Sequence, residues 1–220
     1  MIPQPLFNQY VGFEMLIKIC GVTCPETSRF AAEEGADYIG IILWNKSKRA
    51  VEKSQALEIV EAAKSAGSKA VAVFVEESAE EMVETCRFLG VDIVQLHGKL
   101  SKAEACLLPK SLQRIFALGV DGGGLLELDE NPYRESDLVL LDSIGGGTGK
   151  TFNWESLRKP VESPWILAGG LNLKNIQKAI EILQPDGVDV STGVENGTKG
   201  VKCHALIRKF IEKVNNASVR

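Results

Sequence analysis

Residues 16–20 read Leu-Ile-Lys-Ile-Cys and are the first of eight short apolar runs along the chain. The other seven are residues 38–43, 70–75, 93–96, 114–118, 138–141, 165–168 and 187–190. Each run is too short for an ordinary helix and rich in Ile, Val and Leu, and most are flanked by Gly, Asp or Ser. The runs therefore predict eight buried strands.

Amphipathic segments with apolar residues at helical spacing separate most of these runs, at residues 24–34, 54–66, 78–89, 173–183 and 202–214. Alternating strand and helix signals indicate a parallel sheet. Strands without inside-outside alternation are typical of sheets covered on both faces. An open doubly wound sheet has the same local signature, but eight repeats in 220 residues favour a small α/β fold of the closed (β/α)8 type, a TIM barrel.

Two parts of the chain depart from this repeat. Residues 120–136 contain Gly122-Gly123-Gly124 and Asn131-Pro132, which predict a loop, so that the fifth helix is degenerate. Residues 1–14 precede the first strand, either as an ordered arm on the closed end of the barrel or as an extended start. We therefore expect an amino-terminal extension over 1–14 and a single barrel domain over 15–220.

The composition excludes several classes of function. The hydrophobic content of 45% is enough for one substantial core, and a net charge of -4 with scattered Lys and Arg gives no basic surface for nucleic acid. No apolar run approaches the roughly 20 residues that span a bilayer. We expect no nucleic-acid or membrane partner.

The cysteines indicate the compartment and bear on metal binding. There are five, an odd number, without a Cys-x-x-Cys pair, and the first 14 residues lead us to expect no secretory signal. This pattern is typical of free thiols in a reducing compartment, which predicts a cytoplasmic protein. Only His97 and His204 could complete a metal site, so we expect no bound metal.

Chemistry in such barrels is found where the strands end at their carboxyl termini. Gly169 and Gly170 follow the seventh run, and Ser191, Thr192 and Gly193 follow the eighth. Glycines there let backbone N–H groups approach an anion closely, and a short helix beginning near Thr192 or Gly193 would add the positive end of its dipole. These two adjacent loops predict a phosphate site.

A second glycine-rich segment, residues 145–150, follows the sixth run. It resembles a nucleotide-binding P-loop, but the spacing of its first glycine does not fit that motif. We interpret it as a flexible active-site loop.

Six motifs in order resemble phosphoribosylanthranilate isomerase, an enzyme family of tryptophan biosynthesis. They are Lys18-Ile19-Cys20-Gly21, Ser47-Lys48-Arg49, Gln95-Leu96-His97-Gly98, Leu141-Asp142-Ser143 with 147–152, Leu167-Ala168-Gly169-Gly170-Leu171 and 189–195. The resemblance covers about residues 16–214. It implies an Amadori rearrangement of N-(5-phosphoribosyl)anthranilate to 1-(2-carboxyphenylamino)-1-deoxyribulose 5-phosphate, by acid and base catalysis and without a cofactor.

The resemblance also implies roles for single residues. Cys20 is the expected general base and Asp142 the expected general acid. The base needs a thiol pKa held near or below its ordinary value by cationic neighbours, and the acid needs a carboxyl pKa raised by burial or negative charge.

The same resemblance makes Arg49 the candidate clamp for the anthranilate carboxylate. His97 would shape that end of the pocket, and Asp189 would stabilise an iminium or hold substrate hydroxyls. Two positions depart from the family pattern: Lys48 stands where Pro is common, and Asn153 stands where Asp is frequent. Both changes affect loop stiffness more than chemistry, and Asn153 remains a capable helix cap.

Three other readings fit parts of the pattern. A related isomerase of histidine biosynthesis would carry an aspartate at the position of Cys20, and a sugar-phosphate epimerase would need more histidines for a metal. A noncatalytic phosphate-binding barrel would have no use for both Cys20 and Asp142. The sequence leaves open whether the protein is a monomer or a homodimer.

Overall fold

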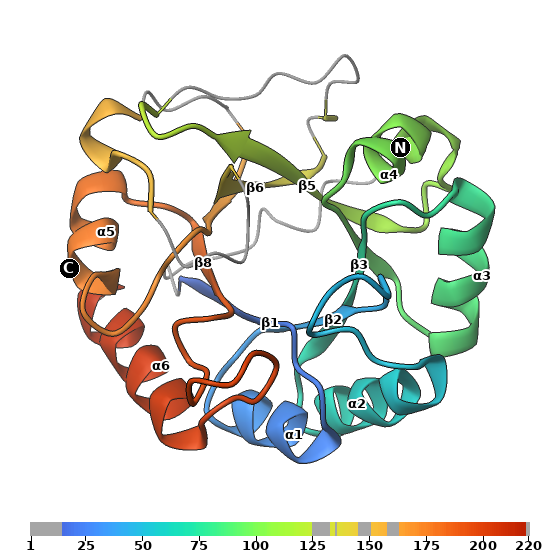
Figure 1. Ribbon diagram of the computed structural model, residues 1–220, viewed down its shortest axis with the longest axis horizontal. Helices are drawn as coiled ribbons and strands as arrows, with labels where there is room; N and C mark the ends of the chain where they lie inside the picture. Colours follow the sequence, from blue (N-terminus) through green and yellow to red (C-terminus); the bar gives the residue numbers. More distant parts are fainter. Residues whose placement is uncertain (1–14, 125–132, 135, 145–150, 158–162, 219–220) are drawn as a thin grey trace, which may run out of the picture.

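The eight predicted strands are present and form a closed barrel. The computed structural model describes residues 15–124, 133–134, 136–144, 151–157 and 163–218. Every strand is parallel to both neighbours, in chain order around the ring (Figure 1). The strands are β1 (Leu16–Cys20), β2 (Tyr38–Ile42), β3 (Lys69–Phe74), β4 (Ile93–Leu96), β5 (Gln113–Val120), β6 (Leu138–Ser143), β7 (Trp165–Leu167) and β8 (Gly187–Val190). The TIM-barrel prediction is confirmed.

Helices cover the outside of the ring, as expected from the amphipathic segments. They are α1 (Pro25–Glu33), α2 (Lys53–Ser65), α3 (Ala79–Leu89), α5 (Ile176–Leu183) and α6 (His204–Ser218). The last helix, α6, lies beside α1 and so completes the outer layer (Figure 1). A further short helix, α4 (Lys99–Ala103), and the 3₁₀ helix η1 (Glu104–Leu107) were not predicted, because segments of five and four residues are too short to show helical periodicity.

The irregular part of the barrel follows β5. None of the described residues between β5 and β6, which are 121–124, 133–134 and 136–137, is helical, in agreement with a degenerate fifth helix. The rest of that connection lies outside the described residues, as do residues 1–14 and the predicted active-site loop at 145–150. Asn153 caps a 3₁₀ helix, η2 (Trp154–Ser156), by accepting a hydrogen bond from the backbone N–H of Glu155. Within the described ranges, no helix has the length and apolarity needed to cross a membrane.

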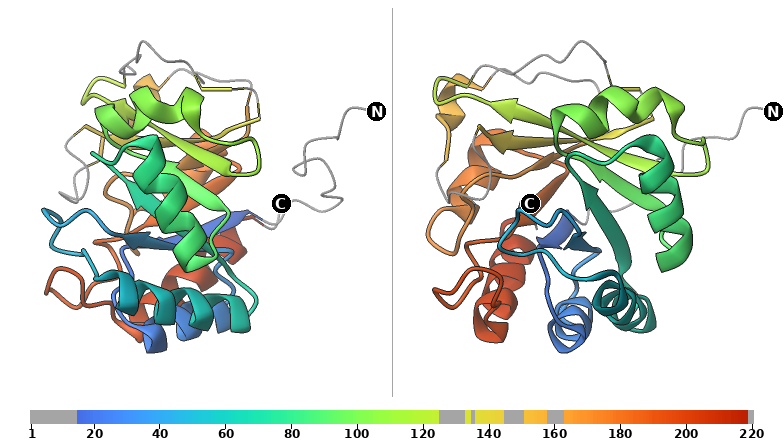
Figure 2. Two further views of the ribbon diagram at one scale, coloured as in Figure 1. Left: turned by 90° about the vertical axis from the view of Figure 1, so that its right-hand side faces the viewer. Right: turned by 45° about the vertical axis from the view of Figure 1, so that its right-hand side comes forward.

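The barrel interior is filled by alternate residues of the strands. A separate apolar cluster comprises Tyr38, Val71, Ile93, Ile115, Ala117, Leu138, Leu140, Ile166 and Ala168. Lys18 is in register with Tyr38 on one side and with Asp189 on the other, so both charged residues belong to the same inward-facing set. The loops after β2 and β8 protrude together from the carboxyl end of the barrel (Figure 2). The interior is therefore apolar except toward that end.

Candidate active site

A cleft at the carboxyl ends of β6, β7 and β8 brings the predicted phosphate residues next to two carboxylates. Its lining consists of Asp142, Ala168, Gly169, Gly170, Leu171, Asp189, Ser191, Thr192 and Gly193. All five residues predicted to bind phosphate are in this set, beside the predicted acid. The cleft can thus hold an anionic group within reach of a proton donor.

Close backbone packing explains the glycines of this cleft. A Cβ on Gly193 would lie 2.0 Å from the carbonyl oxygen of Leu171, so only glycine fits where the loops after β7 and β8 meet. Gly169 and Gly170 have φ angles of 85° and 68°, in the left-handed region. The predicted short helix near Thr192 is wrong: residues 191–195 form a turn in which Glu195 N–H donates to the Thr192 carbonyl.

Asp142 has the properties expected of a general acid. It lies near the end of β6, and its side chain is 15% exposed. Burial, followed by the negative charge of Asp189, raises the pKa of Asp142 from 3.8 to about 7. Hydrogen bonds from Ser143 oppose this rise only in part. At neutral pH a large fraction of Asp142 therefore carries a proton, which is the state that a general acid needs.

His97 lies beside Asp142 without forming an ion pair. Its Nε2 is 3.6 Å from Asp142 Oδ2, which is too long for a hydrogen bond. Burial and then the positive charge of Lys18 lower the pKa of His97, so the ring is neutral at pH 7. Gln95 Nε2 lies 3.1 Å from His97 Nδ1 and orients the ring. A neutral His97 leaves the raised pKa of Asp142 intact and shapes this side of the cleft.

Cys20 ends β1 in contact with a buried lysine. A Cβ on Gly40 would lie 2.8 Å from the Cys20 sulfur and 3.1 Å from Lys18 Nζ, so both atoms face the same point of the interior. Lys18 is fully buried, and its Nζ donates to Asp189 Oδ1 at 3.0 Å. Burial would lower the pKa of Lys18, but the negative charges of Asp189 and a Cys20 thiolate more than compensate, and that pKa lies above its usual value. Lys18 is therefore a permanent cation below the sulfur.

The expected pKa of Cys20 needs correction. We expected the thiol pKa to be held near or below its ordinary value, but burial raises it, and Lys18 opposes that effect only in part because Asp189 adds a negative charge. The thiol form therefore predominates at neutral pH in the absence of substrate. A cationic neighbour is present, as predicted, but it does not outweigh desolvation.

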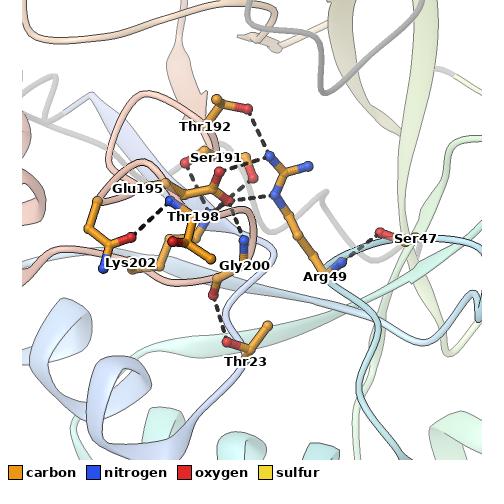
Figure 3. Close-up of polar contacts among 10 residues, drawn as sticks. Thr23, Ser47, Arg49, Ser191, Thr192, Glu195, Thr198, Gly200 and Lys202 are labelled. Atoms are coloured by element: carbon orange, nitrogen blue, oxygen red, sulfur yellow. Dashed lines mark hydrogen bonds and ion pairs between the residues drawn. The ribbon is translucent and has the colours of Figure 1, made fainter.

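Arg49 crosses over the start of the loop after β1 and reaches the loop after β8, which is predicted to bind phosphate (Figure 3). Gly21 makes this possible, since a Cβ there would lie 2.5 Å from Arg49 Cδ. Arg49 Nε donates to Glu195 Oε1 at 2.6 Å, and Nη2 donates to Glu195 Oε2 at 3.1 Å and to Thr192 Oγ1 at 2.8 Å. These bonds use both hydrogens of Nη2 and the one on Nε. Among the described residues, Nη1 donates no hydrogen bond of its own.

Comparison with known proteins agrees with this geometry. Residues 17–213 match the family model described as N-(5'phosphoribosyl)anthranilate (PRA) isomerase. The N-(5'-phosphoribosyl)anthranilate isomerase of Chlamydia felis is 41% identical over 199 residues, which are 90% of this chain and 96% of the relative.

The chain belongs to the phosphoribosylanthranilate isomerase family.

Solved structures of the phosphoribosylanthranilate isomerase family share the fold of this chain. The enzyme from Thermus thermophilus superposes with a TM-score of 0.80 at 28% identity, covering 94% of this chain and all of that one. A family member in complex with reduced 1-(o-carboxyphenylamino)-1-deoxyribulose 5-phosphate has a TM-score of 0.70 at 29% identity, covering 92% of this chain and all of that one.

Within this phosphoribosylanthranilate isomerase barrel, three charged residues near the cleft received no role from the sequence: Lys18, Glu195 and Lys202. Strand alternation is a signal that could have found Lys18, since it stands two positions before Cys20 and so shares its face. Glu195 ends the 189–195 motif, but nothing in the sequence indicates that it pairs with Arg49, and no signal marks Lys202, because the loop that carries both meets Arg49 only in three dimensions. The described part of the chain contains no group of three or more His, Cys, Asp or Glu side chains arranged to hold a metal ion.

Proposed function

We propose that this member of the family catalyses the rearrangement of N-(5-phosphoribosyl)anthranilate in tryptophan biosynthesis, with Asp142 as acid and Cys20 as base. The observation that carries the proposal is the cleft itself, where a carboxyl group with a pKa of about 7 borders a glycine-lined anion site. Cys20 ends β1 at the same end of the barrel, three strands around the ring from β6. A sugar bound by its phosphate would thus have an acid on one side and a thiol on the other.

Each proton has a definite course in this mechanism. Asp142 donates its proton to the furanose ring oxygen as the C1–O bond breaks, and the anthranilate nitrogen supplies the electron pair that forms the iminium. The Cys20 thiolate then removes the proton from C2, and the C–H electrons neutralise the iminium to give an enolamine. Tautomerisation of that enol gives the ketone product. Asp189, held by Lys18, would stabilise the positive charge of the iminium.

The two anionic ends of the substrate have separate binding groups in this proposal. The phosphate would bind among Gly169, Gly170, Ser191, Thr192 and Gly193, where backbone N–H groups and hydroxyls can surround it. The anthranilate carboxylate would bind to Arg49, through Nη1 while the contacts of that side chain with Glu195 and Thr192 persist. The bound product analogue of the family structure carries the same two kinds of group.

Turnover should not depend on an added metal or nucleotide. Purified protein should convert phosphoribosylanthranilate, followed as loss of the fluorescence of the anthranilate moiety, at the same rate before and after incubation with a chelator. The physical reason is that the proposed acid and base are both side chains of the protein. Loss of turnover with chelator, restored by a divalent metal, would contradict a cofactor-free reaction, and no turnover at all would contradict the proposed function.

The pH dependence follows from the two pKa values. The productive form of the enzyme has Asp142 protonated and Cys20 ionised. When the two groups carry only one proton between them, however, their shifted pKa values place that proton mostly on the sulfur. The productive fraction is constant between the two pKa values, so kcat/KM should rise until about pH 7, remain level, and fall only above the pKa of Cys20. Rate measurements from pH 5 to 10 test this.

The control for that profile is Asp142→Asn. Ionisation of the substrate phosphate also affects kcat/KM in the acid range, and its contribution should persist in the residual activity of the variant. In the variant only the ionisation of Cys20 still limits the rate, so the break near pH 7 should disappear and kcat/KM should keep rising toward the pKa of Cys20. A profile of the variant that still levels off at about pH 7 would remove Asp142 as the origin of that break.

The domain organisation, the cellular location and the partners of the protein are also proposals. The site residues all lie within 15–220, which supports one barrel domain with residues 1–14 as an extension. We propose a cytoplasmic location on the basis of the unpaired cysteines, all five of which are free thiols. A phosphorylated small molecule is the proposed partner, with no nucleic acid.

A further inference from the structure

A buried charge cluster lies beneath the proposed phosphate loop. It consists of Arg49, Glu195 and Lys202, whose side chains are 8%, 3% and 0% exposed (Figure 3). Glu195 Oε1 accepts from Arg49 Nε at 2.6 Å, from Lys202 Nζ at 3.2 Å and from Gly200 N–H at 3.0 Å. Two positive charges and one negative charge leave one net positive charge next to an anion site.

Both cations also donate to hydroxyls of the phosphate loop. Arg49 Nη2 donates to Thr192 Oγ1 at 2.8 Å, and Lys202 Nζ donates to Ser191 Oγ at 3.1 Å and to the Ser191 carbonyl at 3.0 Å. Neither cation can accept a hydrogen bond, so each hydroxyl acts as acceptor on that side and directs its own proton elsewhere. A hydroxyl that accepts from a cation is also polarised into a stronger donor.

We propose that Glu195 is a positioning residue that prepares the loop for phosphate by holding Arg49 and Lys202 against the Thr192 and Ser191 hydroxyls. The Ser191 hydroxyl then acts as an oriented donor toward the anion, and a positive charge lies behind each of the two hydroxyls. Burial alone would raise the pKa of Glu195, but the hydrogen bonds from Arg49 and the charge of Lys202 bring it below its usual value, so the carboxylate stays ionised. The proposal rests on the phosphate site of the proposed function and assigns an origin to its affinity.

Glu195→Gln tests the proposal, because it preserves the shape of the side chain but removes the charge that holds both cations. The dissociation constant of inorganic phosphate, measured by calorimetry, should rise about tenfold. The KM for phosphoribosylanthranilate should rise by a similar factor, while kcat changes less than about threefold, since the acid and base are unaffected. In a Ser191→Ala/Thr192→Val background, the same change should have little further effect on phosphate binding.

The matched control is Glu34→Gln on the barrel exterior. Glu34 accepts from Arg208 Nε at 2.9 Å and Nη2 at 2.7 Å, the same bidentate geometry far from the cleft. This variant should leave phosphate affinity and KM unchanged. If Glu195→Gln does not fold, a double-mutant cycle of Arg49→Lys and Thr192→Val replaces it. The inference then requires the effects of these two substitutions on phosphate binding to be non-additive.

The outcomes separate the inference from the proposed function. Phosphate binding by Glu195→Gln equal to that of the parent would overturn the inference and leave the isomerase assignment standing. If Glu195→Gln weakened phosphate binding equally in the Ser191→Ala/Thr192→Val background, the inference would also be overturned, because Glu195 would then act by another route. A parent protein that turns over substrate but binds no phosphate would overturn both the inference and the phosphate site on which it rests.

Discussion

Cys20→Ala should lower kcat by a factor of about 10² to 10⁴, the range for loss of a positioned general base. The sulfur ends β1, and Lys18 beneath it provides the positive charge that makes a thiolate possible inside the barrel. Alanine fits the site without strain, since it removes one atom from a residue that is 7% exposed. The loss should therefore appear in kcat, with KM little changed, because the phosphate and carboxylate contacts remain.

The fluorescence assay measures this effect directly. Cys106→Ala is the matched control, because Cys106 is exposed in η1, away from the cleft, and its replacement should not alter the rate. Cys20→Ser should also be strongly impaired, since a hydroxyl ionises far less readily than a thiol. A Cys20→Ala protein within a fewfold of the parent rate would show that another group removes the C2 proton.

Asp142→Asn should have opposite effects on rate and stability. The rate should fall by about 10² to 10⁴, because an amide cannot donate a proton to the ring oxygen. The fold should become more stable at pH 8 by up to about 4 kcal/mol, since the raised pKa of Asp142 is itself a cost of keeping a buried carboxylate. Below about pH 4, Asp142 is protonated in both the folded and the unfolded parent, so no burial penalty arises. Above about pH 7 it is ionised in both states, and the full penalty of burying the carboxylate destabilises the fold.

Urea unfolding at several pH values measures the stability effect. The difference between variant and parent should grow from about pH 4 to about pH 7 and then stay constant. Asp92→Asn provides the control, because Asp92 is exposed just before β4, away from the cleft, and the same chemical change there should have little effect on stability. A variant less stable than the parent at pH 8 would contradict the burial of an unfavourable charge.

The sequence predicted most of the fold because its signals are local. Strands β1, β4 and β8 were predicted at both ends to the residue, and the other strands and the five longer helices were predicted within a few residues. Strand ends in a parallel barrel all face one way, so the order of the runs alone places the residues that follow them at one site. The cleft at the ends of β6 to β8 agrees with that placement.

The features that were missed depend on three-dimensional packing. The thiol pKa of Cys20 is set by a balance between burial, Lys18 and Asp189, and only the fold determines which of them prevails. The pairing of Arg49 with Glu195 joins residues from the loops after β2 and β8, which no local pattern connects. The short helix expected near Thr192 was wrong, because the chain turns back to form the charge cluster before α6 begins.

The contact between Gly193 and the Leu171 carbonyl has a consequence for protein engineering. Any side chain at position 193 would collide with the backbone of the neighbouring loop, and the two loops are also joined there by a backbone bridge between Asn172 and Gly193. They must therefore be transplanted or redesigned as one module. Attempts to give this scaffold a new substrate should therefore retain both loops together.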